Sequence, residues 1–133
     1  MRKSTVIKQF CKAVFGLPFS VYKYHEWATN SYDTIYFTLD CDEGDVAFRE
    51  NFISRCPIAE KYSDALLSVL HEMGHIATSE EMDWAGRDDC ESYEEYFAQH
   101  DEMLATNWAI DWLNNKDNEI LAKIFEEKWL TAE

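Results

Sequence analysis

The alternation of apolar and polar residues predicts one helix at the start of the chain, followed by three strands. Apolar side chains recur at helical spacing between Val6 and Phe15, and Gly16 then supplies a stop. The next three apolar segments are short and rich in β-branched and aromatic residues, and turn-forming residues separate them: 19–24, 34–39 and 46–53. We expect them to form a small, mainly antiparallel, three-stranded sheet.

Beyond the predicted sheet the apolar period lengthens, which indicates helices. Residues 58–76 follow a repeat of about 3.6 residues and predict a second helix. An acidic, irregular stretch at 78–91 predicts a long loop. Ser92 and Glu95 have the spacing of a capping box, so a third long helix is expected from there to about Asn114.

A fourth helix completes the predicted fold. Asp117 is placed to cap it, and an apolar stripe follows over residues 120–129. The four glycines and two prolines include no linker-like cluster, and no segment repeats. The sequence therefore predicts one α+β domain over 1–133, with about four helices and the three-stranded sheet.

The second predicted helix carries a candidate metal site with the pattern H-E-x-x-H. His71 and His75 lie one turn apart, so their rings can face one ion. Glu72 lies beside them, where a carboxylate can hold and deprotonate a metal-bound water. Gly74 costs roughly 1 kcal/mol in a helix interior, which suggests the close approach of another segment. Two ordinary histidines are the alternative interpretation.

A catalytic zinc ion needs a third protein ligand and one position for water. We favour Glu102, because small residues surround it on one face of the third predicted helix and allow two helix backbones to approach. The alternatives are His100, on roughly the opposite side of that helix, and His25, among strand aromatics.

Two segments together resemble a known family. The run L-H-E-M-G-H at 70–75 and the run E-M-L-A-T-N-W-A-I-D-W-L at 102–113 are similar to the small gluzincin-type domain of ImmA/IrrE proteins and minigluzincins. In that family the later helix reads E-x-x-A-x-x-aromatic-A-x-x-L-L; here Met73 and Trp112 stand where aliphatic residues are usual. The resemblance covers residues 58–113.

The resemblance implies a small zincin-like fold, with zinc as the cofactor. It assigns His71, His75 and Glu102 as zinc ligands and Glu72 as the general base. It also implies a phage or other mobile-element origin.

The expected activity is hydrolysis of peptide bonds in a protein partner. Zincin folds usually present an edge strand above the motif helix, and segment 46–53 is our candidate, because it directly precedes that helix. Tyr93, Tyr96 and His100 are the candidate donors to a developing oxyanion.

The charge distribution narrows the class of partner. The net charge is −14, yet the first 23 residues hold five of the twelve basic residues and no acid, so the remainder carries 7 basic and 26 acidic residues, or −19. Such a surface repels nucleic-acid phosphates and attracts basic ligands, so we expect a protein or peptide partner with basic character and no direct contact with nucleic acid.

The remaining composition indicates a cytoplasmic protein. The apolar runs are too short for a membrane span, and no secretory apolar segment follows Met1. The four cysteines lie far apart without a C-x-x-C pair, so we expect reduced, mostly buried thiols: Cys11, Cys41, Cys56 and Cys90.

Two other hypotheses fit the same sequence. The chain could be an acidic, non-enzymatic interaction protein of the inhibitor, antirestriction or DNA-mimic type, with a structural or vestigial zinc site. Its interaction surface would then include five acidic residues: Asp83, Asp88, Asp89, Glu94 and Glu95. Alternatively, the basic first helix could dock into the acidic cleft as a built-in inhibitor.

Overall fold

The computed structural model describes residues 1–30, 32–83 and 90–133. Within them lie six α-helices: α1 (Lys3–Phe15), α2 (Glu43–Arg55), α3 (Asp64–Ala77), α4 (Tyr93–Phe97), α5 (His100–Asn114) and α6 (Glu119–Thr131). Three short 3-10 helices accompany them: Pro57–Lys61, Ser79–Glu81 and Lys116–Asn118. The strands are β1 (Ser20–Lys23), β2 (Ala28–Thr29) and β3 (Thr34–Phe37). The predicted α+β class with a three-stranded sheet is confirmed.

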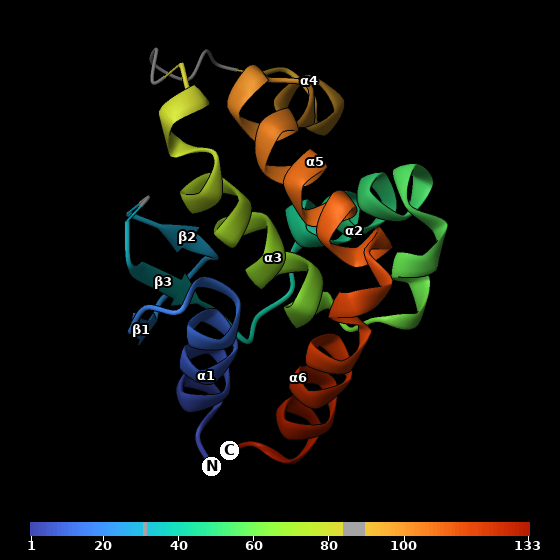
Figure 1. The fold of residues 1–133 in the computed structure, drawn as a ribbon. Helices are drawn as coiled ribbons and strands as arrows, with labels where there is room; N and C mark the ends of the chain where they lie inside the picture. The colour runs from blue at the N-terminus through green and yellow to red at the C-terminus, as the bar shows by residue number, and fades with distance from the viewer. Residues whose placement is uncertain (31, 84–89) are drawn as a thin grey trace.

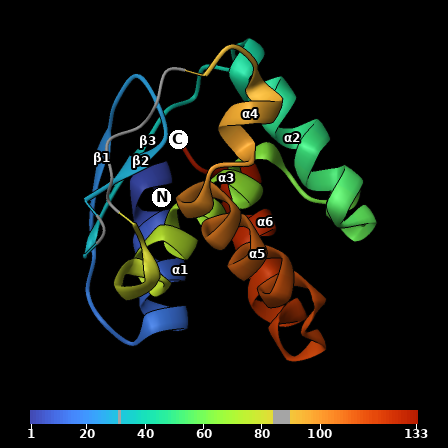
Figure 2. The ribbon, with the colours of Figure 1, turned by 90° about the horizontal axis from the view of Figure 1, so that it is seen from above.

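Helix α3 runs through the middle of the molecule and packs along α5 (Figure 1). The sheet and α2 lie on opposite sides of this helix pair (Figure 2). Helices α1 and α6 pack against each other below it, and the two termini meet there. The Lys3 amide donates to the Glu133 carbonyl at 3.0 Å, and the Glu133 amide donates to the Met1 carbonyl at 2.9 Å.

The sheet is mixed rather than mainly antiparallel. Its order is β1-β3-β2, with β1 parallel and β2 antiparallel to β3. Val21, Ile35 and Phe37 are buried, because alternate residues of a strand point to one face and this face packs on helices. Strand β2 pairs with the side of β3 away from β1, so it is an outer strand of the sheet among the described residues.

The prediction of a strand at 46–53 is wrong, because this segment lies inside α2. Asp42 starts the helix: its side chain accepts from the Asp45 amide, and the Asp45 side chain accepts from the Asp42 amide, each at 3.0 Å. Glu43 and Asp45 place negative charge in the first turn, where the helix dipole favours it. This local capping overrides the β-propensity of the aromatic and branched residues.

The predicted helices are present with different boundaries. Segment 58–76 divides into a 3-10 turn and α3, because the Ser63 side chain accepts from the Leu66 amide and caps α3 there. The expected third helix is capped by Ser92 as predicted, but it breaks where Gln99 takes an extended backbone conformation and starts α5. Residues 84–89 of the predicted loop lie outside the described residues.

Both ends of the chain contribute to the core. Gly16 ends α1 with a φ of 73°, in the left-handed region that suits glycine, as the sequence predicted. The Phe10 ring of α1 packs against Trp112 and Phe125, with centroid distances of 5.4 and 5.0 Å. The fourth predicted helix is α6, which begins at Glu119; Asp117 belongs to the preceding 3-10 turn and does not cap it.

No helix in the described part of the chain is long and apolar enough to cross a membrane.

Candidate metal centre

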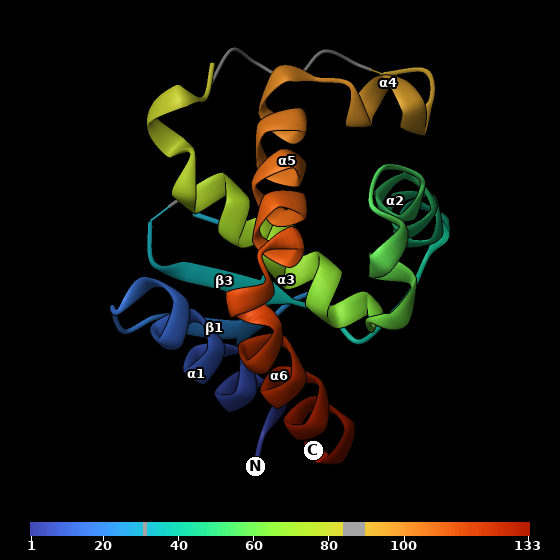
Figure 3. The ribbon, with the colours of Figure 1, turned by 45° about the vertical axis from the view of Figure 1, so that its right-hand side comes forward.

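The crossing of α3 and α5 positions the candidate metal site (Figure 3). Gly74 makes this crossing close: a Cβ atom added there would lie 2.2 Å from the Ala105 carbonyl oxygen. Ala105 and Ala109 are fully buried on the facing side of α5. The interpretation that Gly74 admits a neighbouring segment is confirmed, and that segment is the backbone of α5.

Three predicted ligands converge at this crossing. The Nε2 atoms of His71 and His75 lie 2.7 and 3.1 Å from one oxygen, Oε2, of Glu102. Their possible ligand atoms all lie within 4.8 Å of one another. The group therefore could hold a metal ion, because zinc bonds to nitrogen and oxygen are about 2.0–2.2 Å long.

A second layer of contacts orients these ligands. Thr106 Oγ1 lies 2.9 Å from His71 Nδ1, and the Tyr96 hydroxyl donates to Glu102 Oε1 at 2.9 Å. The Phe48 ring packs edge-on against the His71 ring at 5.1 Å. Thr106 and Phe48 thus fix the orientation of the His71 ring, with Nε2 facing Glu102. Histidines that bind a metal usually have such an orienting partner on their other ring nitrogen.

The local charges favour an ionised carboxylate at the site. Burial alone would raise the pKa of Glu102, but hydrogen bonds to His71 and His75 and the charges of their rings lower this pKa well below its usual range. Glu102 is therefore an anion at neutral pH, the form that binds metal ions.

The site opens into a cleft of about 1290 Å³. All four histidines of the chain and eight carboxylate residues line it, including Glu72, which is buried beside the ligands on α3. Among the described lining residues there is no lysine or arginine. The cleft therefore combines a candidate metal site with a strongly negative wall.

The alternative ligands lie apart from the three-residue group. His100 is exposed, with Nε2 3.1 Å from the Glu81 carbonyl, and His25 is exposed beside the Tyr24 ring. Both line the cleft without joining the group. The candidate oxyanion donors Tyr93 and Tyr96 line the cleft as well.

Helix α1 does not enter the cleft, so the built-in inhibitor hypothesis is wrong. Val6, Ile7, Phe10 and Cys11 are buried in the core, and α1 packs on β1 and α6. None of the cleft-lining residues belongs to α1.

Two orienting residues were missed from the sequence. Thr106 stands four residues after Glu102, on the same face of α5, and this i, i+4 relation was a usable signal. Phe48 gave no signal, because its segment was assigned to a strand.

Comparison of the chain with known protein families, with curated proteins and with solved structures returns no match.

Proposed function

We propose that the chain is a zinc-dependent peptidase that hydrolyses peptide bonds of a protein partner. The observation that carries the proposal is the convergence of His71, His75 and Glu102 from two crossing helices, with Glu72 in the same cleft. The resemblance to ImmA/IrrE-type domains supports the same ligands and the same base.

The side chains at the crossing fit zinc. Two imidazoles and one carboxylate form a donor set common in catalytic zinc sites, and they leave room for a further ligand. The contact between Thr106 and His71 Nδ1 fits as well, since the ring nitrogen away from a metal usually has a hydrogen-bond partner. Zinc supplies Lewis acidity, which makes water more acidic and polarises a carbonyl group.

Glu72 provides the proton transfers in this mechanism. It takes a proton from the attacking water and passes it to the leaving amine. Its side chain is buried in the wall of the cleft, and burial restricts its rotamers. We assign stabilisation of the oxyanion to Tyr93 or His100, which both line the cleft, because the Tyr96 hydroxyl already donates to Glu102.

We assign substrate positioning to the outer strand β2 instead of segment 46–53. Ala28 and Thr29 line the cleft, and β2 packs against α3. An extended peptide can add to such a strand through main-chain hydrogen bonds.

Elemental analysis tests the metal. We expect one zinc per chain in the purified protein and a loss of bound zinc in Glu102→Ala. Glu127→Ala, which removes an exposed carboxylate on α6, is the matched control and should keep the metal. A wild-type protein without zinc after reconstitution would contradict the proposal.

A peptide-cleavage assay tests the role of Glu72 as the general base. With a mixture of quenched fluorescent decapeptides as substrate, Glu72→Gln should keep zinc and lose activity by about 100-fold to 10,000-fold. Cleavage at the wild-type rate by this variant would exclude Glu72 as the base.

A second candidate function is that of an acidic, non-enzymatic interaction protein. The net charge of −14 and the carboxylate-lined cleft favour it. In that case Glu72→Gln is harmless, whereas charge reversal at Asp83, Glu94 and Glu95 abolishes binding of the partner. Asp88 and Asp89 of the same predicted surface lie outside the described residues.

A further inference from the structure

A side cavity of about 150 Å³ adjoins the cleft. The two share four lining residues: Trp27, Asp45, Phe48 and Ser68. Because the Phe48 ring also packs against His71, this cavity begins directly beside the candidate metal site. A side chain of a peptide in the cleft could therefore reach it.

The walls of the side cavity combine aromatic surface with negative charge. The rings of Trp27, Phe48 and Trp129 line it together with Asp40, Asp45 and Asp64. Aromatic faces and carboxylates are the groups that bind the stem and the head of a long cationic side chain.

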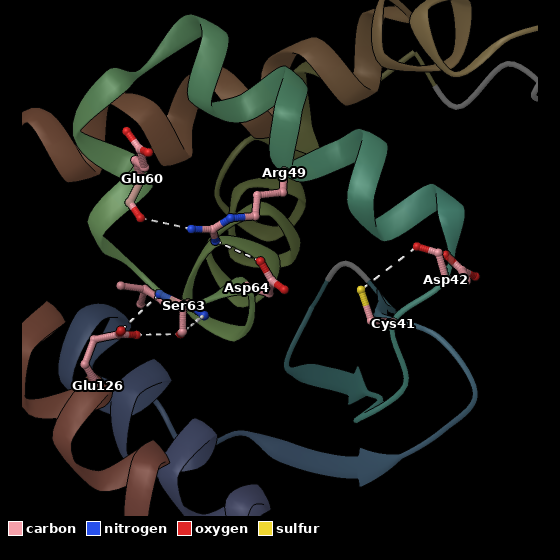
Figure 4. A network of polar contacts seen from close by, with 8 residues as sticks. Cys41, Asp42, Arg49, Glu60, Ser63, Asp64 and Glu126 are labelled. Atoms are coloured by element: carbon pink, nitrogen blue, oxygen red, sulfur yellow. Dashed lines mark hydrogen bonds and ion pairs between the residues drawn. The ribbon is translucent and has the colours of Figure 1, made fainter.

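Arg49, the one cationic side chain among the described residues that line the side cavity, is already paired. Arg49 donates to Asp64 Oδ1 at 2.8 Å and to the Glu60 carbonyl at 3.0 Å, and Figure 4 shows its guanidinium turned toward both. Among the described residues no lysine or arginine forms an ion pair with Asp40 or Asp45. The side cavity thus keeps two negative charges that Arg49 does not balance.

We propose that this side cavity is a specificity pocket that binds a lysine or arginine side chain of the substrate, with its cationic head at Asp45. The inference rests on the proposed function, because it takes a peptide to lie in the cleft. A cavity of about 150 Å³ admits a group the size of benzene, so one long side chain fits. An apolar side chain would instead cover the Asp45 carboxylate without pairing it.

We assign recognition of the cationic head to Asp45, because it is the carboxylate that lines both the cleft and the side cavity. Its Oδ2 accepts from the Asp42 amide, which fixes the orientation of the side chain. Burial and the charges of Asp42 and Asp64 raise the pKa of Asp45, so a bound cation relieves an unfavourable local charge.

Peptide binding tests the proposal independently of cleavage. The zinc-loaded Glu72→Gln protein is titrated with three fluorescein-labelled decapeptides that differ only in a central lysine, norleucine or glutamate, and anisotropy is recorded. Norleucine keeps the length of lysine and removes its charge. We expect the lysine peptide to bind about twofold to fivefold more tightly than the norleucine peptide, as one partly exposed ion pair allows.

Asp45→Asn in the same background should abolish this preference. The asparagine oxygen still accepts from the Asp42 amide, so the start of α2 is kept. Asp117→Asn removes the same charge from an exposed site outside both cavities and should keep the preference. Equal affinity for lysine and norleucine, tighter binding of norleucine, no binding of any peptide, or a preference that survives Asp45→Asn would overturn the pocket. If the lysine preference is observed but the wild-type protein cleaves no peptide, the proposed peptidase activity is rejected and the pocket is kept.

Discussion

The two nitrogens of the His71 ring have different partners, and this division sets the orientation of the candidate ligand. Nε2 faces Glu102 Oε2 at 2.7 Å, while Nδ1 lies 2.9 Å from the Thr106 hydroxyl. With a metal on Nε2, the proton would stay on Nδ1 and be donated to Thr106. Thr106 would therefore act on a metal ion only through the histidine.

Thr106→Val should weaken zinc binding by about 10-fold to 100-fold, as is usual when a partner of a metal-binding histidine is lost. Valine fills nearly the same buried volume but removes the hydroxyl. Competition with a chromophoric chelator measures the affinity. Thr106→Ser, which keeps the hydroxyl, should bind zinc within about threefold of wild type, and equal affinities in all three proteins would contradict this role.

The residues that converge on the candidate site were predictable because their signals are local. His71, Glu72 and His75 lie within one helical turn, and Glu102 shares a face with small residues such as Ala105. Phe48 was not predictable in this way, because its contact with His71 depends on how two distant segments pack.

At the scale of elements, the spacing of α3 and α5 holds the candidate ligands together. The spacing depends on Gly74, whose hydrogen faces the Ala105 backbone. His71 and His75 belong to one helix and Glu102 to the other, so any separation of the helices also separates these candidate ligands.

Gly74→Ala should therefore destabilise the protein by about 2 kcal/mol, which is the largest usual cost of overpacking less the gain in helix propensity. Alanine favours the helix by roughly 1 kcal/mol, but its Cβ would meet backbone atoms that cannot rotate away, and overpacking usually costs 1–3 kcal/mol or more. Urea unfolding measures the loss, and zinc affinity should fall with it. Gly44→Ala is the matched control: its Cβ would meet only side-chain atoms, at 3.2 Å or more, so stability should stay within about 1 kcal/mol. Similar losses in both variants would contradict the close crossing.

Helix α2 shows where prediction from apolar patterning fails. Phe52 is its one buried hydrophobic residue among those described, so the segment has no clear helical stripe. Its branched and aromatic residues favour a strand, whereas Asp42 and Asp45 begin a helix by satisfying each other's amides. At this position the cap was the better predictor.

At the scale of the whole molecule, the basic helix α1 packs on the core and takes no part in the acidic cleft. The basic first helix closes the core at the end where the termini meet, and Lys3 donates to the Trp129 carbonyl at 2.7 Å. Eight of the 26 acidic residues line the cleft instead. The uneven charge was visible in the sequence, but its meaning depended on the position of α1, which long-range packing against α6 determines.

The buried thiol of Cys11 on α1 makes the free energy of unfolding depend on pH. Burial raises the pKa of the Cys11 thiol from 9.0 to about 12. Below pH 9.0 the thiol is protonated in both the folded and the unfolded chain. Between pH 9.0 and about 12 it ionises only in the unfolded chain, so the free energy of unfolding falls through this window, by about 4 kcal/mol at most.

Urea unfolding of wild type and Cys11→Ala at pH 7, 9 and 10.5 tests this linkage. Cys11→Ala is expected to lose about 1 kcal/mol at pH 7 from the smaller side chain, yet to lose less stability than wild type as the pH rises. Tyrosine and lysine ionisation affects both proteins alike, so the difference between them isolates the thiol. Cys41→Ala, which removes an exposed thiol, should follow the wild-type curve more closely. Parallel losses of stability in wild type and Cys11→Ala up to pH 10.5 would contradict this linkage. The Cys11 thiol would then be ionised or hydrated in the folded protein, and α1 would not exclude water from this end of the core.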